Sequence, residues 1–157
     1  MKTINCEDTV KALIEKNITV STAESCTGGM LGQCITSVSG ASAIYGYGFI
    51  TYANEAKEKI LGVSHETLLK YGAVSEQTAR EMALGAHKQS GAMLCVSVTG
   101  IAGPTGGTKE TPVGLVYVGL YFKGNVRAVK LLLSGSREDV RIKTCESVFK
   151  LIAGEIK

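Results

Sequence analysis

The first candidate for chemistry is a hydroxyl beside a thiol, Ser25 and Cys26, just before the glycine pair Gly28 and Gly29. The preceding residues alternate like a β-strand and the following ones repeat like a helix, so both side chains lie where a strand ends and a helix begins. Ligands dock at such strand ends, where N–H groups near Thr27, Gly28 and Gly29 could hold a developing oxyanion. Ser25 is therefore a candidate nucleophile. The alternatives are that Ser25 or Thr27 only caps the helix, or that Cys26 is the nucleophile.

A lysine near the start of a later helix is the second candidate. Asn54 is expected to cap a helix that runs through Ile60, which places Lys57 in the first turn. The positive end of the helix dipole opposes an ammonium group there and favours the neutral amine, the form that a general base requires. The alternative is a solvated surface lysine, a description that also fits the nearby Lys59.

A glycine-rich loop, 100–108, follows a run typical of a buried strand. Its backbone N–H groups could wrap a phosphate or ribose, and the missing Gly-Lys-Ser/Thr disfavours a nucleoside-triphosphate P-loop. Arg137 stands at the start of a helix that Ser136 is expected to cap, where the dipole opposes its charge, so we expect it to hold an anion. Arg141 lies one turn later on the same face. The alternatives are that the loop is only an elaborate turn and that the two arginines form salt bridges.

Composition narrows the class of protein. The 157 residues are 45% hydrophobic and 20% charged, which suits one globular domain spanning residues 1–157. A net charge of +3 without a Lys/Arg stripe argues against nucleic-acid binding, and no apolar stretch suits a membrane span or a signal peptide. Five cysteines without C-x-x-C, and two distant histidines, argue against disulfides and metal. We expect a reduced, cytoplasmic domain without metal or cofactor.

Residue patterns also predict the fold. Helices are expected from Asp8, after Gly29, and near Asn54, Ser64, Ser75 and Ser136, with strands over 18–24, 46–52, 93–98, 113–122 and 126–133. Strands separated by helices, followed by a hairpin, predict a three-layer α/β/α sandwich around a mixed sheet with a C-terminal antiparallel hairpin. The apolar edge of that hairpin favours a homo-oligomer.

Several segments together resemble one known family. The stretches 23–29, 38–42, 51–57, 72–75, 99–107 and 112–114 are similar, in this order, to the CinA C-terminal domain. The likeness covers nearly the whole chain. That family includes stand-alone nicotinamide-nucleotide amidohydrolases, so the resemblance implies hydrolysis of nicotinamide mononucleotide to nicotinic acid mononucleotide and ammonia, in pyridine-nucleotide recycling.

The resemblance also implies the residues that act. Ser25 and Lys57 form a Ser/Lys pair that needs neither metal nor cofactor. The residues expected to bind the small-molecule nucleotide are Thr27, Gly28, Gly29, Ser42, Tyr52, Thr99, Gly100, Gly103, Gly106, Gly107, Arg137 and Arg141. The N-terminal domain of full-length CinA proteins is missing, so we expect its activity to be absent. The alternative function is a non-catalytic nucleotide-binding or regulatory module that uses the glycine loop and Arg137.

Overall fold

A mixed β-sheet forms the centre of the molecule. The structure, a computed structural model, describes residues 4–157. Its strands are β1 (Val20–Glu24), β2 (Tyr45–Ile50), β3 (Leu94–Gly100), β4 (Leu115–Phe122) and β5 (Asn125–Leu132), in the spatial order β2-β1-β3-β4-β5. Strands β2 and β3 both run parallel to β1, whereas β4 and β5 are added antiparallel as a hairpin. The C-terminal ends of β1, β2 and β3 therefore meet at one edge of the sheet.

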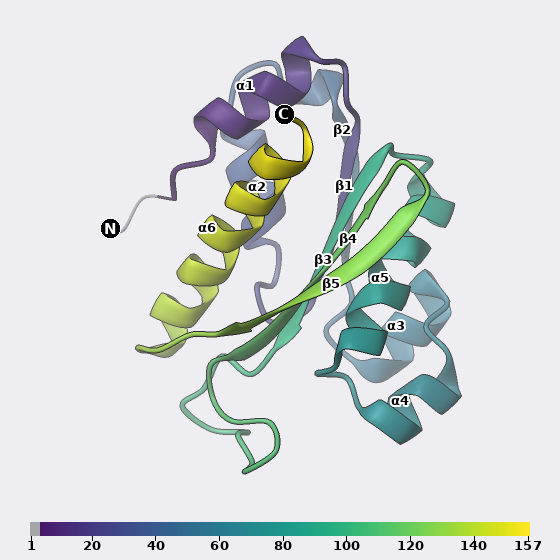
Figure 1. The fold of residues 1–157 in the computed structure, drawn as a ribbon, viewed down its shortest axis with the longest axis vertical. Coiled ribbons are helices and arrows are strands. Elements are labelled where there is room, and N and C mark those ends of the chain that lie inside the picture. The colour runs from purple at the N-terminus through teal and green to yellow at the C-terminus, as the bar shows by residue number, and fades with distance from the viewer. Residues whose placement is uncertain (1–3) are drawn as a thin grey trace.

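Helices cover both faces of this sheet, as Figure 1 shows. One face carries α1 (Glu7–Glu15), α2 (Met30–Thr36) and α6 (Arg137–Glu155), and the other carries α3 (Asn54–Leu61), α4 (His65–Tyr71) and α5 (Glu76–Ser90). A short 3₁₀-helix, η1 (Ala41–Ala43), precedes β2. The predicted three-layer α/β/α sandwich with a C-terminal hairpin is confirmed.

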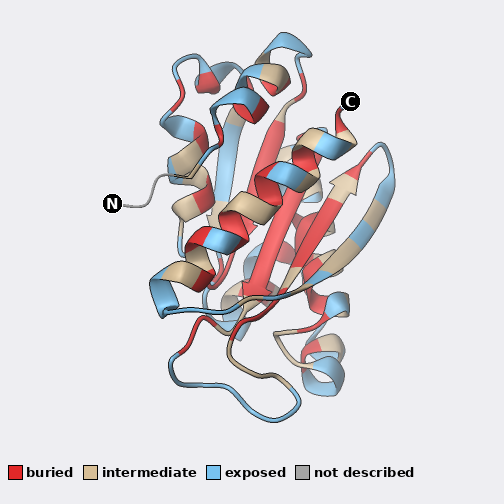
Figure 2. Ribbon diagram, turned by 60° about the vertical axis from the view of Figure 1, so that its left-hand side comes forward, coloured by how far each residue is buried: buried red, intermediate tan, exposed pale blue. Residues whose placement is uncertain are grey.

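Burial explains why the middle strands are so apolar. Every residue of β1 is buried, and β3 is buried except at its last residue, because helices cover both of their faces. The edge strands β2 and β5 are mostly exposed or half-buried, which Figure 2 shows as pale ribbons beside the red central strands. The strand that leads to Ser25 is thus held rigidly in the core.

Local signals place most of the element boundaries. Ser75 accepts a hydrogen bond from the N–H of Thr78, and Ser136 forms a capping box with Asp139, so both helices begin where the sequence predicted. The N-cap of α3 is Ala53, and Asn54 is its first helical residue, one position from the expected cap.

The hairpin turn occupies two residues. Lys123 and Gly124 have φ angles of 52° and 80°, the left-handed pair that matches the twist of two-residue hairpins, and β5 begins at Asn125. The strand β5 carries Arg127 and Lys130, charges that oppose pairing with another sheet edge. The homo-oligomer stays a prediction.

Close packing of α5 against α3 fixes the helix that carries Lys57. A Cβ atom at Gly85 of α5 would collide with the carbonyl group of Leu61 at the end of α3. Glycine therefore lets the two helices approach.

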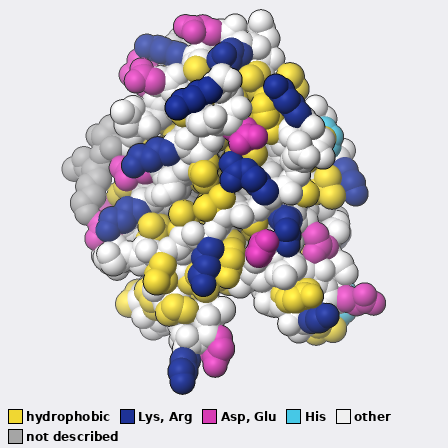
Figure 3. Space-filling view, viewed as in Figure 1, with side chains coloured by type: hydrophobic (Ala, Val, Ile, Leu, Met, Phe, Trp, Pro, Cys, Tyr) yellow, Lys and Arg dark blue, Asp and Glu magenta, His cyan; other side chains and the backbone are white. Residues whose placement is uncertain are grey.

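Figure 3 shows Lys and Arg side chains scattered among acidic and apolar ones on the face it presents, without a basic stripe. Within residues 4–157, no helix has the length and apolar character that a membrane crossing requires.

Candidate active site

Ser25 follows the last residue of β1, at the edge where the parallel strands end. Its N–H donates to the carbonyl of Val98 on β3 at 3.0 Å, so the sheet pairing continues to the serine itself. Gly28 and Gly29 have φ angles of 57° and 104°, which residues with a Cβ rarely adopt, and Gly29 is the N-cap of α2. Neither Ser25 nor Thr27 caps the helix, so that alternative is wrong.

The side chain of Lys57 reaches Ser25 from α3. Its side chain is only 1% exposed, so the alternative of a solvated surface lysine is wrong. The Nζ atom lies 3.0 Å from Ser25 Oγ, 2.8 Å from the carbonyl oxygen of Thr51 and 3.4 Å from that of Tyr52. The structure therefore brings together the serine and the lysine that the sequence singled out.

The buried position of Lys57 favours a neutral amine. Burial lowers the pKa of Lys57 from its ordinary value, because the charged form loses its hydration. Its Nζ contacts no carboxylate within the described residues. A neutral amine has two N–H donors and one lone pair. As an ammonium, Lys57 Nζ donates to all three oxygens; as a neutral amine, it can give its two N–H groups to the carbonyl oxygens and keep the lone pair for the proton of the Ser25 hydroxyl.

A buried carboxylate, Glu24, holds the turn next to Ser25. It is 2% exposed and accepts hydrogen bonds from Thr27 Oγ1 at 2.7 Å, from Leu31 N–H at 2.8 Å and from Gly32 N–H at 3.1 Å. The carboxylate thus satisfies free N–H groups at the start of α2. The fully buried Thr27 hydroxyl therefore serves this carboxylate. No local sequence pattern marks Glu24 for this role.

The expected oxyanion donors are only partly available. The N–H of Gly28 already donates to the Ser25 carbonyl at 3.0 Å, so it is not free to bind an oxyanion. Arg141 fastens the same turn to α6, because its Nε and Nη2 atoms donate to the carbonyls of Cys26 and Thr27 at 3.2 and 3.0 Å. Arg141 therefore acts on the shape of the turn.

A hollow of about 220 Å³ adjoins Ser25. The residues that line it are Ser25, Cys26, Tyr52, Gly100, Ile101, Ala102, Gly103, Thr105, Gly106 and Arg137. Arg137 spans it from the start of α6, donating from Nη1 to the Gly103 carbonyl at 2.8 Å and from Nη2 to the Tyr52 hydroxyl at 3.1 Å. The glycine loop, Tyr52 and Arg137 thus form the walls of a recess next to the serine.

Three other expected binding residues lie outside this hollow. Thr99 is buried, and its hydroxyl donates to the Ala73 carbonyl at 2.7 Å. Gly107 packs closely against Val113. Ser42 lies in η1, before β2 begins, at the end of the sheet opposite to Ser25. The structure does not bring Ser42 to the site.

The other candidate nucleophile, Cys26, and the two histidines are placed unfavourably for catalysis at Ser25. Burial raises the pKa of the Cys26 thiol to about 11, so a thiolate is disfavoured at neutral pH. His65 is exposed on α4, and its Nδ1 lies 2.6 Å from Glu58 Oε1. His87 stacks on Tyr121, with ring centroids 4.0 Å apart.

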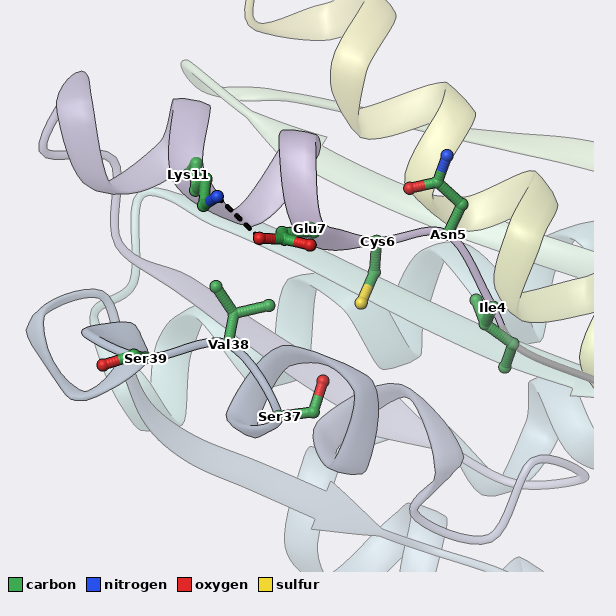
Figure 4. Close-up of a pocket in the computed structure, with 8 residues that line it drawn as sticks. All are labelled: Ile4, Asn5, Cys6, Glu7, Lys11, Ser37, Val38 and Ser39. Atoms are coloured by element: carbon green, nitrogen blue, oxygen red, sulfur yellow. Dashed lines mark hydrogen bonds and ion pairs between the residues drawn. The ribbon is translucent and has the colours of Figure 1, made fainter.

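A larger hollow lies away from Ser25. It measures about 640 Å³ and is bounded by the start of α1 and the residues after α2. In Figure 4, Glu7 and Lys11 form an ion pair of 2.6 Å along its wall, and Ser37, Val38 and Ser39 form the opposite side. Both segments precede the strands β1 and β2, so this hollow is at the other end of the sheet. Among the described residues that line it, none is a nucleophile paired with a base, and we place the candidate active site at Ser25.

The fold and the site define an α/β protein with a buried Ser/Lys pair at the end of parallel strands. The family model for the CinA C-terminal domain matches residues 3–156, so the chain belongs to that family. A CinA-like protein of Kosmotoga olearia is 54% identical over 135 residues, which cover 86% of this chain and 33% of that protein. The chain spans about a third of the length of the curated relatives it matches.

Solved structures share the fold along the entire chain. The competence/damage inducible protein CihA from Agrobacterium tumefaciens superposes with a TM-score of 0.93 at 39% identity, covering 100% of both chains. A competence-damaged protein (CinA) superfamily protein from Enterobacter cloacae gives 0.92 at 33% identity, covering 100% of this chain and 95% of that one. The resemblance to CinA proteins that the sequence motifs indicated is confirmed.

Proposed function

We propose that residues 1–157 are a single amidohydrolase domain that converts nicotinamide mononucleotide to nicotinic acid mononucleotide and ammonia, in cytoplasmic pyridine-nucleotide recycling. The observation that carries this proposal is the 3.0 Å contact between Lys57 Nζ and Ser25 Oγ in a buried setting. A hydroxyl is a weak nucleophile by itself and needs a nearby base to take its proton. Membership in the CinA family supports the same proposed function.

The reaction follows from this pair in two stages. Ser25 Oγ attacks the carboxamide carbon while its proton passes to Lys57 Nζ, and Lys57 then gives that proton to the departing nitrogen, which leaves as ammonia. Water next attacks the ester on Ser25 and transfers a proton to Lys57. The ester bond to Ser25 Oγ breaks, Lys57 returns the proton to Ser25 Oγ, and the carboxylic acid product leaves.

The lowered pKa of Lys57 is what makes this base usable. An ordinary lysine, with a pKa of about 10.4, is almost entirely protonated near neutral pH and has no lone pair to offer. Burial favours the neutral form, and the position in the first turn of α3 acts in the same direction. A cationic pyridinium bound nearby would further disfavour the ammonium form.

Arg137 is proposed to hold the phosphate group of the substrate. Its guanidinium has five N–H donors, and the contacts with Gly103 and Tyr52 leave donors for an anion that enters the hollow. The Arg137→Ala variant should raise KM for nicotinamide mononucleotide by a factor that corresponds to about 1.5–3 kcal/mol. Nicotinamide riboside lacks the phosphate and should show a much smaller change in steady-state assays. Equal changes for both substrates would reject the phosphate role.

The central test is release of ammonia from nicotinamide mononucleotide. Wild-type protein should release it, and Ser25→Ala should lose several orders of magnitude in rate while its circular dichroism and unfolding midpoint stay near wild type. Cys26→Ala is the matched control and should keep most of the activity. Loss in the cysteine variant alone would favour the thiol. Nucleotide binding without any ammonia release by the wild type would favour the non-catalytic nucleotide-binding module.

A further inference from the structure

One buried hydroxyl beside the Ser/Lys pair has no hydrogen-bond partner. Among the described residues 4–157, Thr51 Oγ1 is the buried side-chain nitrogen or oxygen atom that lacks one. The residue itself is 0% exposed. Buried hydroxyls are nearly always paired, because an unpaired one gives up its hydrogen bonds to water without replacement. An exception next to a candidate catalytic centre calls for a functional reason.

The sheet places Thr51 directly beside Ser25. Glu24 of β1 lies opposite Ile50 of β2, and the N–H of Thr51 donates to the Glu24 carbonyl at 2.9 Å, so the next pair in this parallel register is Ser25 with Thr51. Neighbouring strands lie about 4.8 Å apart. The two hydroxyl-bearing residues are therefore adjacent across the strands.

Their side chains also share one face of the sheet. Side chains alternate along a strand, so Ser25 points to the same face as Ala23, and Thr51 to the same face as Phe49. Ala23 and Phe49 both pack in the cluster that contains Leu61 of α3. This is the face from which Lys57 enters.

Lys57 already engages the backbone of Thr51. Its Nζ lies 2.8 Å from the Thr51 carbonyl oxygen, so the free hydroxyl belongs to a residue in direct contact with the base. Once Ser25 carries an acyl group, its oxygen has no proton to give, and the lone pair of Lys57 needs another donor. Water is the required reactant at that stage of hydrolysis.

We propose that the Thr51 hydroxyl positions the water molecule that Lys57 deprotonates when the ester on Ser25 is hydrolysed. The hydroxyl holds the water oxygen, the water proton passes to Lys57 Nζ, and the oxygen forms the new bond to the acyl carbon. The ester bond to Ser25 Oγ then breaks, and Lys57 returns the proton to that oxygen. This inference rests on the proposed Ser25/Lys57 hydrolysis and assigns Thr51 to its second stage.

The test compares Thr51→Val, which keeps the shape and removes the hydroxyl, with Thr51→Ser, which keeps a hydroxyl. With nicotinamide mononucleotide, the valine variant should release a burst of ammonia close to one equivalent of enzyme and then turn over about tenfold or more slowly, since a misplaced reactant slows a positioned step strongly. The kcat and KM values should fall together, and intact-mass spectrometry should detect the acyl group on Ser25. The serine variant should restore turnover and abolish the burst.

Stability provides a readout that separates this role from a structural one. The hydroxyl makes no hydrogen bond within the protein, so urea unfolding of Thr51→Val should match or exceed wild type. A clear loss of stability, a valine variant with normal turnover, or a fall in kcat/KM without an acyl intermediate would each overturn the proposal for Thr51. A wild-type protein that releases no ammonia would instead overturn the hydrolase function itself, and the water-positioning role with it.

Discussion

Two buried ionisable side chains, Glu24 and Lys57, lie at the C-terminal end of β1, and their surroundings differ. Glu24 accepts three hydrogen bonds from donors of the turn and α2, which is how a carboxylate is stabilised away from water. Lys57 has two carbonyl oxygens and a hydroxyl around it, and its Nζ meets no carboxylate within the described chain. The oxygens of Glu24 thus have hydrogen-bond donors, whereas burial without a carboxylate partner disfavours the charged form of Lys57.

This difference in surroundings separates a structural role for Glu24 from a chemical role for Lys57. The Glu24 contacts anchor the turn that follows Ser25, so removing them should affect folding. The Nζ atom of Lys57 contacts Ser25 Oγ, so replacing Lys57 should affect the reaction. If this distinction holds, variants at the two positions will separate loss of stability from loss of activity.

The largest expected effect is on the reaction rate at Lys57. Lys57→Arg keeps a positive charge and a long side chain, but arginine stays protonated at any working pH and offers no lone pair. Its rate of ammonia release should fall by about a thousandfold or more, close to that of Lys57→Ala. Wild-type kcat/KM should rise with pH along one limb that lies below the ordinary lysine range, as burial lowers the pKa. Substantial activity in the arginine variant would reject Lys57 as the base.

The next largest effect is on stability at Glu24. Glu24→Ala leaves three buried donors without their acceptor and should lower the free energy of unfolding by about 3 kcal/mol in urea titrations. Glu24→Gln keeps an acceptor oxygen but places an amide nitrogen among donors, so its loss should be smaller. An activity loss in Glu24→Gln at full stability would show that the carboxylate takes part in the chemistry.

The smallest effect is a pH dependence of stability caused by Lys57. Its pKa is lowered in the folded protein, so between that value and the ordinary value of 10.5 the unfolded chain binds the additional proton. Wild-type stability should therefore rise with pH across this window, by up to about 1.36 kcal/mol per pH unit from this group. The Lys57→Met variant should lack this rise. The difference between the wild-type and variant unfolding series should therefore increase with pH across the same window. Parallel series for the two proteins would mean that Lys57 is charged in the folded state.

Sequence reasoning located the serine and the lysine because each carried a local signal. Ser25 stood before two glycines at a strand end, and Lys57 stood in the first turn of a helix against its dipole. Glu24 and Thr51 carried no such signal, because their roles depend on neighbours. Glu24 acts through N–H groups seven and eight residues later, and the role proposed for Thr51 depends on its place beside β1, where its N–H donates to the Glu24 carbonyl. Ser42 is a different case, because it stands in a segment that resembles the family and the topology places it at the opposite end of the sheet from Ser25.

What the sequence alone determined is the set of elements and their order. Alternation, periodicity and capping residues act over a few neighbours, so they specify strands, helices and the hairpin without knowledge of the rest of the chain. Only the tertiary structure decided that Lys57 loses its water, that its Nζ meets Ser25 Oγ, and that Arg137 rather than Arg141 faces the hollow. Burial and contact are properties of the packed chain. The protonation state of the lysine, and with it the chemistry, follows from packing that no local pattern encodes.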